Sequence, residues 1–234
     1  MNTVKKIYGG FTKTEKILWT VSVLLITLSY LIFDRGSTLT LIASLVGVTS
    51  LIFCAKGNPF GQVLMIVFGS LYGVISYSFS YYGEMITYIG MTVPMAVFSL
   101  VSWLKNPYNG NRSVVRVNRI SKKEWIFLSF LTLAVTVIFY FILKELGTSN
   151  LAPSTFSVTT SFCAAYLTFR RSPYYALVYA LNDIVLIVLW IMASFYDISY
   201  VSVVICFAAF LANDLYGFYC WMKMEKRQSA ASKI

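Results

Sequence analysis

Residues Tyr174–Tyr196 have the sequence YYALVYALNDIVLIVLWIMASFY, in which Asp183 is the one charged side chain. An α-helix needs roughly 20 mainly apolar residues to cross a bilayer, and this run is long enough. It is apolar throughout and lacks the two-residue alternation of a β-barrel strand. The stretch therefore predicts a membrane-spanning helix.

Seven further runs of the same kind lie along the chain of 234 residues. The eight expected spans are Ile17–Phe33, Thr38–Ala55, Val63–Tyr82, Met85–Leu104, Trp125–Leu143, Ser154–Phe169, Tyr174–Tyr196 and Tyr200–Met222. No small-residue cleavage site follows the first run, so we interpret it as a retained helix and not as a signal peptide. The sequence predicts an all-α membrane protein of about eight transmembrane helices.

Composition excludes several other classes of protein. The chain is 58% hydrophobic and only 12% charged, which suits neither a soluble domain nor a disordered chain. It contains no His, and its four Cys lie in apolar runs without CxxC spacing. No GxxxxGK[ST] sequence for binding ATP phosphates is present. We therefore expect no metal site, no cofactor and no ATP hydrolysis.

The formal net charge is +10, from 19 Lys and Arg against nine Asp and Glu. If the N-terminus is cytoplasmic, only Arg35 and Lys144 of these basic residues fall in loops outside the cell. Cytoplasmic loops are rich in Lys and Arg, so the charge predicts that both termini are cytoplasmic and does not indicate nucleic acid. The basic loop Lys105–Lys123 is expected to contact anionic lipid, or alternatively to dock a protein partner.

A weak internal repeat supports this topology. With an offset of 114 residues Pro59 aligns with Pro173, and near the ends of the repeats Trp103 aligns with Trp221 at an offset of 118. Two three-helix units joined by one linker helix have the same orientation, as in some transporters. The predicted divisions are an N-terminal segment with an extra helix at 1–37, a first bundle at 38–105, a basic loop and linker helix at 106–153, a second bundle at 154–223 and a tail at 224–234.

Two carboxyl groups lie within predicted spans, and each follows an asparagine: Asn182–Asp183 and Asn213–Asp214. A charge at the middle of a bilayer costs about 2.5–3.5 kcal/mol on insertion scales. No Lys or Arg falls within any predicted span to compensate that charge. We predict that these four side chains bind a cationic or hydroxyl-bearing substrate. The alternative is that they only hydrogen-bond neighbouring helices.

Aromatic side chains share faces with these polar residues. Tyr179 lies four residues before Asp183, and Trp190 lies seven residues after it. Tyr216 follows Asn213 by three residues, so it is expected on the same helix face. We predict that these rings stack on a planar substrate, although ordinary packing would also explain them.

Pro94 lies in the middle of a predicted span, within Thr92-Val93-Pro94-Met95. Proline removes one backbone hydrogen bond and weakens the helix at that point. Transporters use such breaks as hinges, so we predict a hinge here; a tolerated kink is the alternative.

Several short motifs share their order and spacing with a known family. They are Gly57-Asn58-Pro59-Phe60-Gly61, Leu71-Tyr72-Gly73, Tyr82-Gly83-Glu84, Pro94-Met95 and Asn213-Asp214-Leu215-Tyr216-Gly217 with Trp221. Over residues 38–225 the chain resembles the PnuC family of bacterial vitamin transporters. The resemblance implies a three-plus-one-plus-three helix core, like a full-length SWEET sugar transporter, with one extra N-terminal helix.

The resemblance also implies a function and a location. It implies uptake of nicotinamide riboside, thiamine, riboflavin or a deoxynucleoside across the bacterial cytoplasmic membrane. It further implies facilitated diffusion, trapping of the substrate by cytosolic phosphorylation, and a homotrimer. The chain departs from the riboside-type pattern, because Ala176 and Tyr179 replace a tryptophan pair and amide-bearing positions are occupied by Phe68, Tyr88 and Ala96. These departures favour another ring-bearing vitamin or nucleoside.

Two functions from other classes are weighed against transport. An intramembrane aspartyl protease could use Asp183 and Asp214 as a carboxyl pair that activates water. The chain lacks the Tyr-Asp and Gly-x-Gly-Asp sequences expected for such an enzyme. A membrane receptor or assembly subunit without transport activity is the other alternative, and the lack of room for a soluble domain argues against it. We therefore expect a transporter and not an enzyme.

Overall fold

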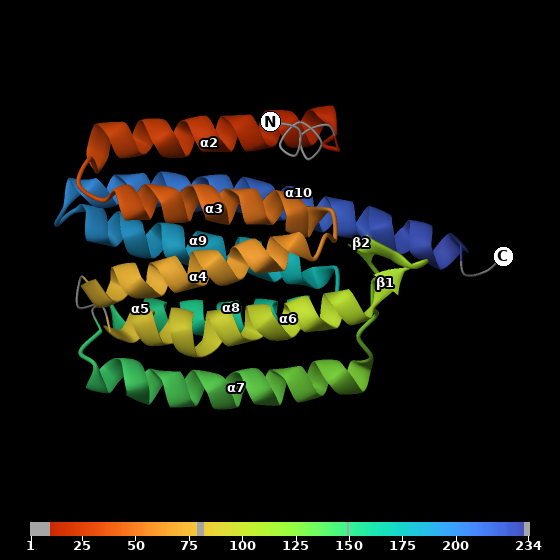
Figure 1. Ribbon diagram of the computed structural model, residues 1–234. Helices are drawn as coiled ribbons and strands as arrows, with labels where there is room; N and C mark the ends of the chain where they lie inside the picture. Colours follow the sequence, from red (N-terminus) through yellow and green to blue (C-terminus); the bar gives the residue numbers. More distant parts are fainter. Residues whose placement is uncertain (1–9, 79–81, 149, 232–234) are drawn as a thin grey trace.

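The computed structural model describes residues 10–78, 82–148 and 150–231 (Figure 1). Its elements are α2 (Lys13–Phe33), α3 (Thr38–Ala55), α4 (Phe60–Ser78), α5 (Tyr82–Ile86), the π-helix η1 (Thr87–Thr92), α6 (Val93–Lys105), β1 (Pro107–Tyr108), β2 (Asn111–Val115), α7 (Lys122–Glu145), α8 (Leu151–Phe169), α9 (Tyr174–Ser194), the 3-10 helix η2 (Ile198–Tyr200) and α10 (Val201–Ala231). Helical structure occupies the described part of the predicted spans, except Phe195 and Tyr196 after the end of α9, and this confirms the predicted all-α class. The ends of the chain at 1–9 and 232–234, which are predicted to be cytoplasmic, lie outside the described residues. Residues 79–81 of the third predicted span also lie outside them.

Within the described residues, seven helices are long and apolar enough to cross a membrane. Helix α8 is not one of them, because its 19 residues include three serines and four threonines. The outward faces of α2 and α7 are apolar and exposed, as Leu28 and Phe130 illustrate. A large exposed apolar surface is unfavourable in water and is the surface that a bilayer requires.

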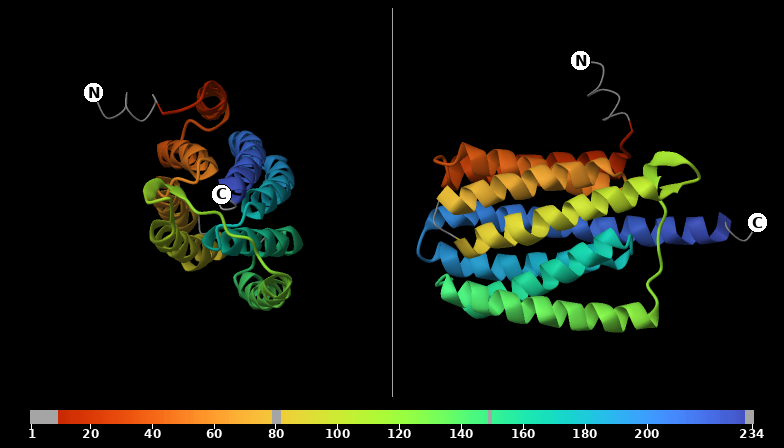
Figure 2. Two further views of the ribbon diagram at one scale, coloured as in Figure 1. Left: turned by 90° about the vertical axis from the view of Figure 1, so that its right-hand side faces the viewer. Right: turned by 60° about the horizontal axis from the view of Figure 1, so that its bottom comes forward.

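Six helices of the described chain form a closed ring, in the order α3, α4, α6, α8, α9, α10 and back to α3. Helix α2 lies outside this ring against α3 and α10, and α7 lies outside it against α8 (Figure 2). Three helices of the ring precede α7 in the chain and three follow it, so the two halves meet at an α3–α10 seam and an α6–α8 seam. The assignment of these halves to repeated three-helix units with α7 as linker stays a prediction.

Glycines allow the helices of the ring to approach closely. A Cβ atom at Gly47 of α3 would lie 2.6 Å from the ring of Phe210 and 2.8 Å from the ring of Phe68. A Cβ atom at Gly73 of α4 would lie 2.4 Å from the side chain of Ile89 in η1. Small residues at helix contacts are how membrane helices gain packing contacts without a hydrophobic driving force between them.

The loops predicted to be cytoplasmic gather at one end of the bundle, on the right in Figure 1. The strands β1 and β2 form a short antiparallel hairpin there, and its turn residues Asn109 and Gly110 have positive φ angles of 47° and 75°. Arg119 after the hairpin pairs with Glu225 on α10 at 2.6 Å. This hairpin was not predicted, since the sequence indicated only a basic loop.

The opposite end carries shorter connections. Between α9 and η2, the carboxylate of Asp197 accepts a hydrogen bond from the backbone N–H of Ser199 at 2.9 Å. Hydrogen bonds from the backbone and the hydroxyl of Ser199 favour the ionised form and lower the pKa of Asp197 below its ordinary value. Asp197 therefore caps the short helix η2 as an anion.

Candidate functional site

The internal repeat of the sequence recurs in the geometry of two turns. Gly57 after α3 and Arg171 after α8 are 114 residues apart, and both have left-handed φ angles, of 65° and 57°. The N–H of Gly57 donates to the carbonyl of Cys54, and the N–H of Arg171 donates to the carbonyl of Thr168, each at 2.9 Å. Equivalent positions of the two halves therefore end their helices in the same way.

Two tryptophans connect these turns across the halves. The indole Nε1 of Trp103 on α6 donates to the carbonyl of Thr168 at 2.9 Å, and that of Trp221 on α10 donates to the carbonyl of Cys54 at 2.8 Å. The two rings lie 5.3 Å apart between centroids, and both residues are fully buried. Each half therefore donates one indole hydrogen bond to the other, and the tryptophan pair fills the space between them at this end.

Arg171 makes further hydrogen bonds between the halves at the same end. Its guanidinium donates to the hydroxyl of Ser102 on α6 at 2.7 Å and to the carbonyl of Arg116 at 3.1 Å. Burial lowers the pKa of Arg171, and the nearby charges of Arg170 and Arg116 lower it further. The turn between α8 and α9 is thereby held against α6 and the basic loop.

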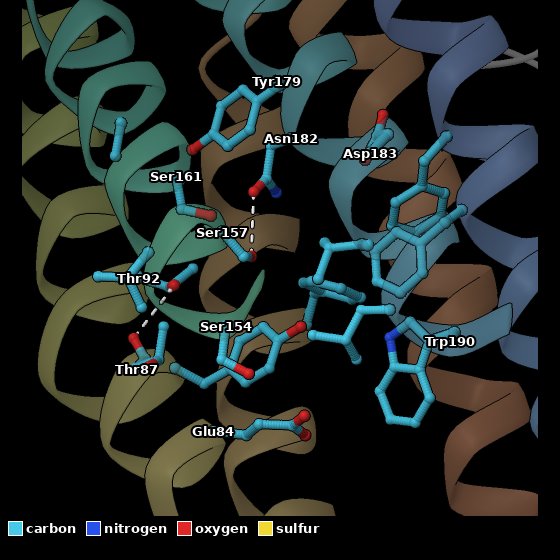
Figure 3. Close-up of a pocket in the computed structure, with 18 of the residues that line it drawn as sticks. Glu84, Thr87, Thr92, Ser154, Ser157, Ser161, Tyr179, Asn182, Asp183 and Trp190 are labelled. Atoms are coloured by element: carbon cyan, nitrogen blue, oxygen red, sulfur yellow. Dashed lines mark hydrogen bonds between the residues drawn. The ribbon is translucent and has the colours of Figure 1, made fainter. Parts of the chain in front are cut away.

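Beyond the tryptophan pair, a cavity of about 120 Å³ lies between the halves (Figure 3). Toward the other end of the bundle it adjoins a wider recess of about 650 Å³. The residues that line both spaces are Glu84, Thr148, Ser154, Leu189 and Trp190. The cavity therefore adjoins, through this recess, the end of the bundle that is opposite to the tryptophan pair.

Helix α9 supplies four of the predicted site residues to this cavity: Tyr179, Asn182, Asp183 and Trp190. The amide oxygen of Asn182 accepts two hydroxyl hydrogen bonds from α8, at 3.1 Å from Ser157 and at 2.7 Å from Thr160. These two hydrogen bonds fix the orientation of the Asn182 amide, and the residue still lines the cavity.

Asp214 of α10 also lines the cavity, as predicted, next to Asp183. The two carboxyl groups are within hydrogen-bonding reach of each other, and the residues are only 3% (Asp183) and 5% (Asp214) exposed. The Oδ2 atom of Asp183 is buried and has no hydrogen-bond partner among the described residues.

Helix α8 contributes hydroxyl groups that sequence reasoning missed. Ser154, Ser157 and Ser161 follow one face of α8 and line the cavity. A spacing of three and four residues places side chains on the same side of a helix. The low hydropathy of this span was the signal that could have found them, since a helix in a bilayer places its polar face toward protein or water.

The consecutive helices α5, η1 and α6 pass beside the cavity, and the residues before Pro94 that line it belong to α5 and η1. Pro94 occupies the second position of α6, directly after the π-helix. Proline cannot donate a backbone hydrogen bond, and π-turns occur where the regular ladder is interrupted. The hydroxyl of Thr92 donates to the carbonyl of Thr87 at 3.2 Å, and both threonines face the cavity, whereas Pro94 does not. The hinge role of Pro94 stays a prediction.

Aromatic rings form the wall opposite α8. Phe68 of α4 lies 6.1 Å from Tyr88 of η1 and 5.8 Å from Phe210 of α10, between ring centroids. Phe207 continues the wall, 5.7 Å from Phe210. Phe68 and Tyr88 are positions where the chain departs from the amide-bearing pattern of the family it resembles, and both line the cavity.

Two predicted residues, Asn213 and Tyr216, lie away from the cavity and face α2. The amide of Asn213 donates to the hydroxyl of Ser22 on α2 at 2.9 Å. Tyr216 interacts with the side chain of Thr12 at the start of α2. The contact of Asn213 fits the alternative interpretation of the sequence, in which Asn and Asp side chains only hydrogen-bond neighbouring helices.

We expect Asn213→Ala to lower stability while leaving substrate affinity unchanged within about twofold. The substitution removes a buried hydrogen bond between α10 and α2, and such bonds contribute about 0.5–1.5 kcal/mol. Thermal unfolding of the detergent-purified protein measures the first effect, and a binding titration measures the second. A loss of affinity without a loss of stability would contradict this assignment.

Asn182→Ala, unlike Asn213→Ala, is expected to lower substrate affinity, by about tenfold. The variant removes a polar group from the cavity wall and leaves the hydroxyl of Ser157 without its acceptor, whereas Thr160 keeps carbonyl acceptors in its own helix. We expect a change of about 1.4 kcal/mol in binding. The same titration measures it, with Asn213→Ala as the matched control. Equal affinity in the two variants would show that Asn182 has no part in the site.

Comparison with known proteins agrees with this architecture. A family model described as "Nicotinamide mononucleotide transporter" matches residues 37–223. A nicotinamide riboside transporter PnuC of Neisseria mucosa is 24% identical over 229 residues, which cover 96% of this chain and 87% of the relative. The nicotinamide riboside transporter PnuC of Haemophilus influenzae is 23% identical over 217 residues, 92% of each chain.

A solved structure described as "Crystal structure of the Vitamin B3 transporter PnuC" has the same fold. The TM-score is 0.81 at 22% identity, with 96% of this chain and 97% of that chain covered. The family model begins at residue 37 and so excludes α2, which lies outside the helix ring. The resemblance inferred from the short motifs is confirmed, and because the family model covers most of the chain, this protein belongs to the nicotinamide mononucleotide transporter family of membrane transporters.

Proposed function

We propose that this protein takes up a ring-bearing vitamin or nucleoside of the nicotinamide riboside class across the bacterial cytoplasmic membrane. The observation that carries the proposal is a cavity between the two halves with an aromatic wall on one side and hydroxyl, amide and carboxyl groups on the other. Aromatic rings stack on planar rings, and the polar groups suit a sugar or ring substituent. Nicotinamide riboside, thiamine, riboflavin and deoxynucleosides are the candidate substrates.

The proposed mechanism is facilitated diffusion by alternating access. Substrate enters the cavity from the wide recess at the end opposite the tryptophan pair. The halves then rock about the cavity, and the crossed hydrogen bonds of Trp103 and Trp221 break to release substrate at the other end. Cytosolic phosphorylation traps it. The shared lining of cavity and recess, together with the crossed hydrogen bonds at the tryptophan end, supports this order of steps.

The proposal extends to orientation and assembly. We assign both termini to the cytoplasm, which the clustering of basic loops at one end supports. The apolar outer faces of α2 and α7 contact lipid, and the transporter assembles as a homotrimer. Asp183, Asp214, Asn182, Tyr179 and Trp190 bind substrate, Pro94 is a hinge, and the chain has no enzymatic activity.

Uptake into proteoliposomes tests the proposal. Purified protein is reconstituted and given labelled nicotinamide riboside, thiamine, riboflavin and deoxynucleosides one at a time. We expect saturable uptake of at least one of them, and empty liposomes provide the background. Background rates for the entire panel would refute the proposed substrate class.

One observation favours the alternative of an aspartyl protease: Asp183 and Asp214 line the same cavity, and their carboxyl groups interact. Asp183→Ala separates the two functions. Loss of uptake in this variant, with no cleavage of membrane substrates by the wild-type protein, supports transport. Cleavage by the wild type that disappears in the variant would support the protease instead.

A further inference from the structure

A segment after the β-hairpin crosses the tryptophan end of the bundle from one half to the other. It comprises residues 115–119, beginning with the last residue of β2, and we name it the strap. The hairpin and the end of α10 lie beside each other at this end (Figure 1). Val115 is fully buried in the same apolar cluster as Cys54, Trp103 and Trp221. The strap therefore covers the tryptophan pair on the side away from the cavity.

The strap is anchored to the first half. A single residue, Asn106, separates the end of α6 from β1, and the backbone N–H of Arg116 donates to its carbonyl at 2.8 Å. The backbone N–H of Val115 donates to the carbonyl of Gly57, in the turn after α3, at 2.9 Å. A Cβ atom at Gly57 would lie 3.2 Å from Cγ1 of Val115, so the glycine permits this close approach. The chain and both hydrogen bonds tie the strap to α3 and α6.

The side chain of Gln228 on α10 fastens the strap to the second half. Its amide oxygen accepts a hydrogen bond from the backbone N–H of Val117 at 2.8 Å. Its amide nitrogen donates to the carbonyl of Val115 at 3.0 Å. These are two backbone groups that a neighbouring β-strand would bond, and they would otherwise be unpaired at the edge of the hairpin.

Two further contacts join the strap to the second half. The backbone N–H of Asn118 donates to the carbonyl of Arg171, after α8, at 3.0 Å. The ion pair between Arg119 and Glu225 lies on the exposed side, where the side chain of Arg119 is 72% exposed, and such pairs contribute little. The side-chain nitrogen of Asn118 is buried without a partner among the described residues. Release of the strap would expose this donor to water, which lowers the cost of opening.

The part of α10 that carries Gln228 lies beyond the length needed to cross a bilayer. Helix α10 has 31 residues, whereas about 20 are enough to span the hydrocarbon. Its last turns contain Lys223, Lys226 and Arg227, which belong in water. Gln228 is also absent from the described lining of the cavity. Its contacts with the strap therefore involve neither the membrane nor the bound substrate.

We propose that Gln228 is a positioning residue for substrate release, which acts by holding the strap closed across the tryptophan end. The strap must detach from Gln228 before the two halves part at this end, because it is anchored to one half and fastened to the other. The inference rests on the proposed function, which places substrate release here. It follows that Gln228 sets the rate of opening and leaves substrate affinity unchanged.

Labelling of Cys54 with maleimide measures how often this end opens. In a protein whose other three cysteines are alanine, Gln228→Leu should react about tenfold faster than the parent, because it loses two hydrogen bonds and keeps the bulk of the side chain. Gln228→Glu keeps the acceptor for Val117 and loses the donor, so its rate should be intermediate. Lys226→Ala, at an exposed position of the same helix, is the control and should react like the parent.

A reversible cross-link tests whether the strap must detach during transport. Arg119→Cys and Glu225→Cys are combined in a protein whose four native cysteines are alanine, and a bifunctional methanethiosulfonate joins the strap to α10. We expect proteoliposome uptake to fall at least about tenfold, binding affinity to stay within about twofold, and uptake to return after reduction. The same protein without cross-linker is the matched control.

The possible outcomes separate this proposal from the proposed function. Faster labelling of Gln228→Leu, together with reversible loss of uptake on cross-linking, supports the role of the strap. Labelling at the parent rate, or unchanged uptake in the cross-linked protein, overturns it and leaves the proposed function intact. If the control takes up none of the candidate substrates, the proposed function fails, and the labelling rates still decide whether Gln228 holds this end closed. If Gln228→Leu does not fold, Gln228→Glu and the cross-link provide the test.

Discussion

Replacing Asp183 with alanine is expected to lower substrate affinity and uptake about 100-fold. Asp183 lines the cavity, and its Oδ2 atom is buried with no partner among the described residues, so we expect a ligand to supply the missing contact. Contacts to charged groups contribute about 1.5–3 kcal/mol, which corresponds to roughly 10- to 150-fold in affinity. The loss of Asp183 also leaves the carboxyl group of Asp214 without its neighbour.

Binding titration and proteoliposome uptake measure this effect on the same preparation. Glu145→Gln is the control, because Glu145 is an exposed carboxylate at the end of α7 and lies outside the cavity. Thermal unfolding establishes that both variants are folded. If the Asp183 variant were folded and bound substrate as tightly as the control, Asp183 would have a structural role only.

The second large effect is expected at the tryptophan pair. Trp221→Ala should lower the free energy of unfolding by about 3–5 kcal/mol, as large truncations of buried aromatic side chains do. Trp221→Phe loses the hydrogen bond to the carbonyl of Cys54 and the pyrrole part of a fully buried ring, so it should cost about 1–3 kcal/mol, less than the alanine variant. Because Trp103 makes the equivalent bond to Thr168, Trp103→Phe should cost a similar amount.

The same substitutions test the gating role of the pair. Cys54 lies buried behind Trp221, which bonds its carbonyl. In a protein whose other three cysteines are replaced by alanine, a membrane-impermeant maleimide applied from the tryptophan end should label Cys54 slowly. The double variant Trp103→Phe, Trp221→Phe should label about tenfold faster. Equal labelling rates would mean that the crossed hydrogen bonds do not keep this end closed.

The fold class followed from the sequence because a bilayer restricts the backbone severely. Every N–H and C=O group in hydrocarbon needs an internal partner, so long apolar runs are helices. The predicted span Thr38–Ala55 coincides with α3, and Tyr174 begins α9 as expected. The hairpin after α6 and the π-helix before Pro94 were not predicted, since neither changes hydropathy and both depend on local backbone hydrogen bonding.

The site was predicted in part. Asp183 was conspicuous because charge within a membrane is expensive, and five of the seven proposed binding residues line the cavity. The serines of α8 were not conspicuous, because a helical hydroxyl can bond a carbonyl of its own helix at little cost, as Thr160 does with Phe156 at 3.1 Å. The crossed tryptophan bonds were also missed, although the repeat had paired Trp103 with Trp221.

Asn213 and Asp214 show where inference from sequence ends. They are consecutive on α10, yet Asp214 lines the cavity while Asn213 bonds Ser22 of α2. The sequence alone determined the helices, the end of the bundle where the basic loops gather, and which side chains are costly in a membrane. Only the tertiary structure decided which of them face the cavity, because a helix that is apolar on all sides carries no mark of its inner face, and the closing of the helix ring assigns that face.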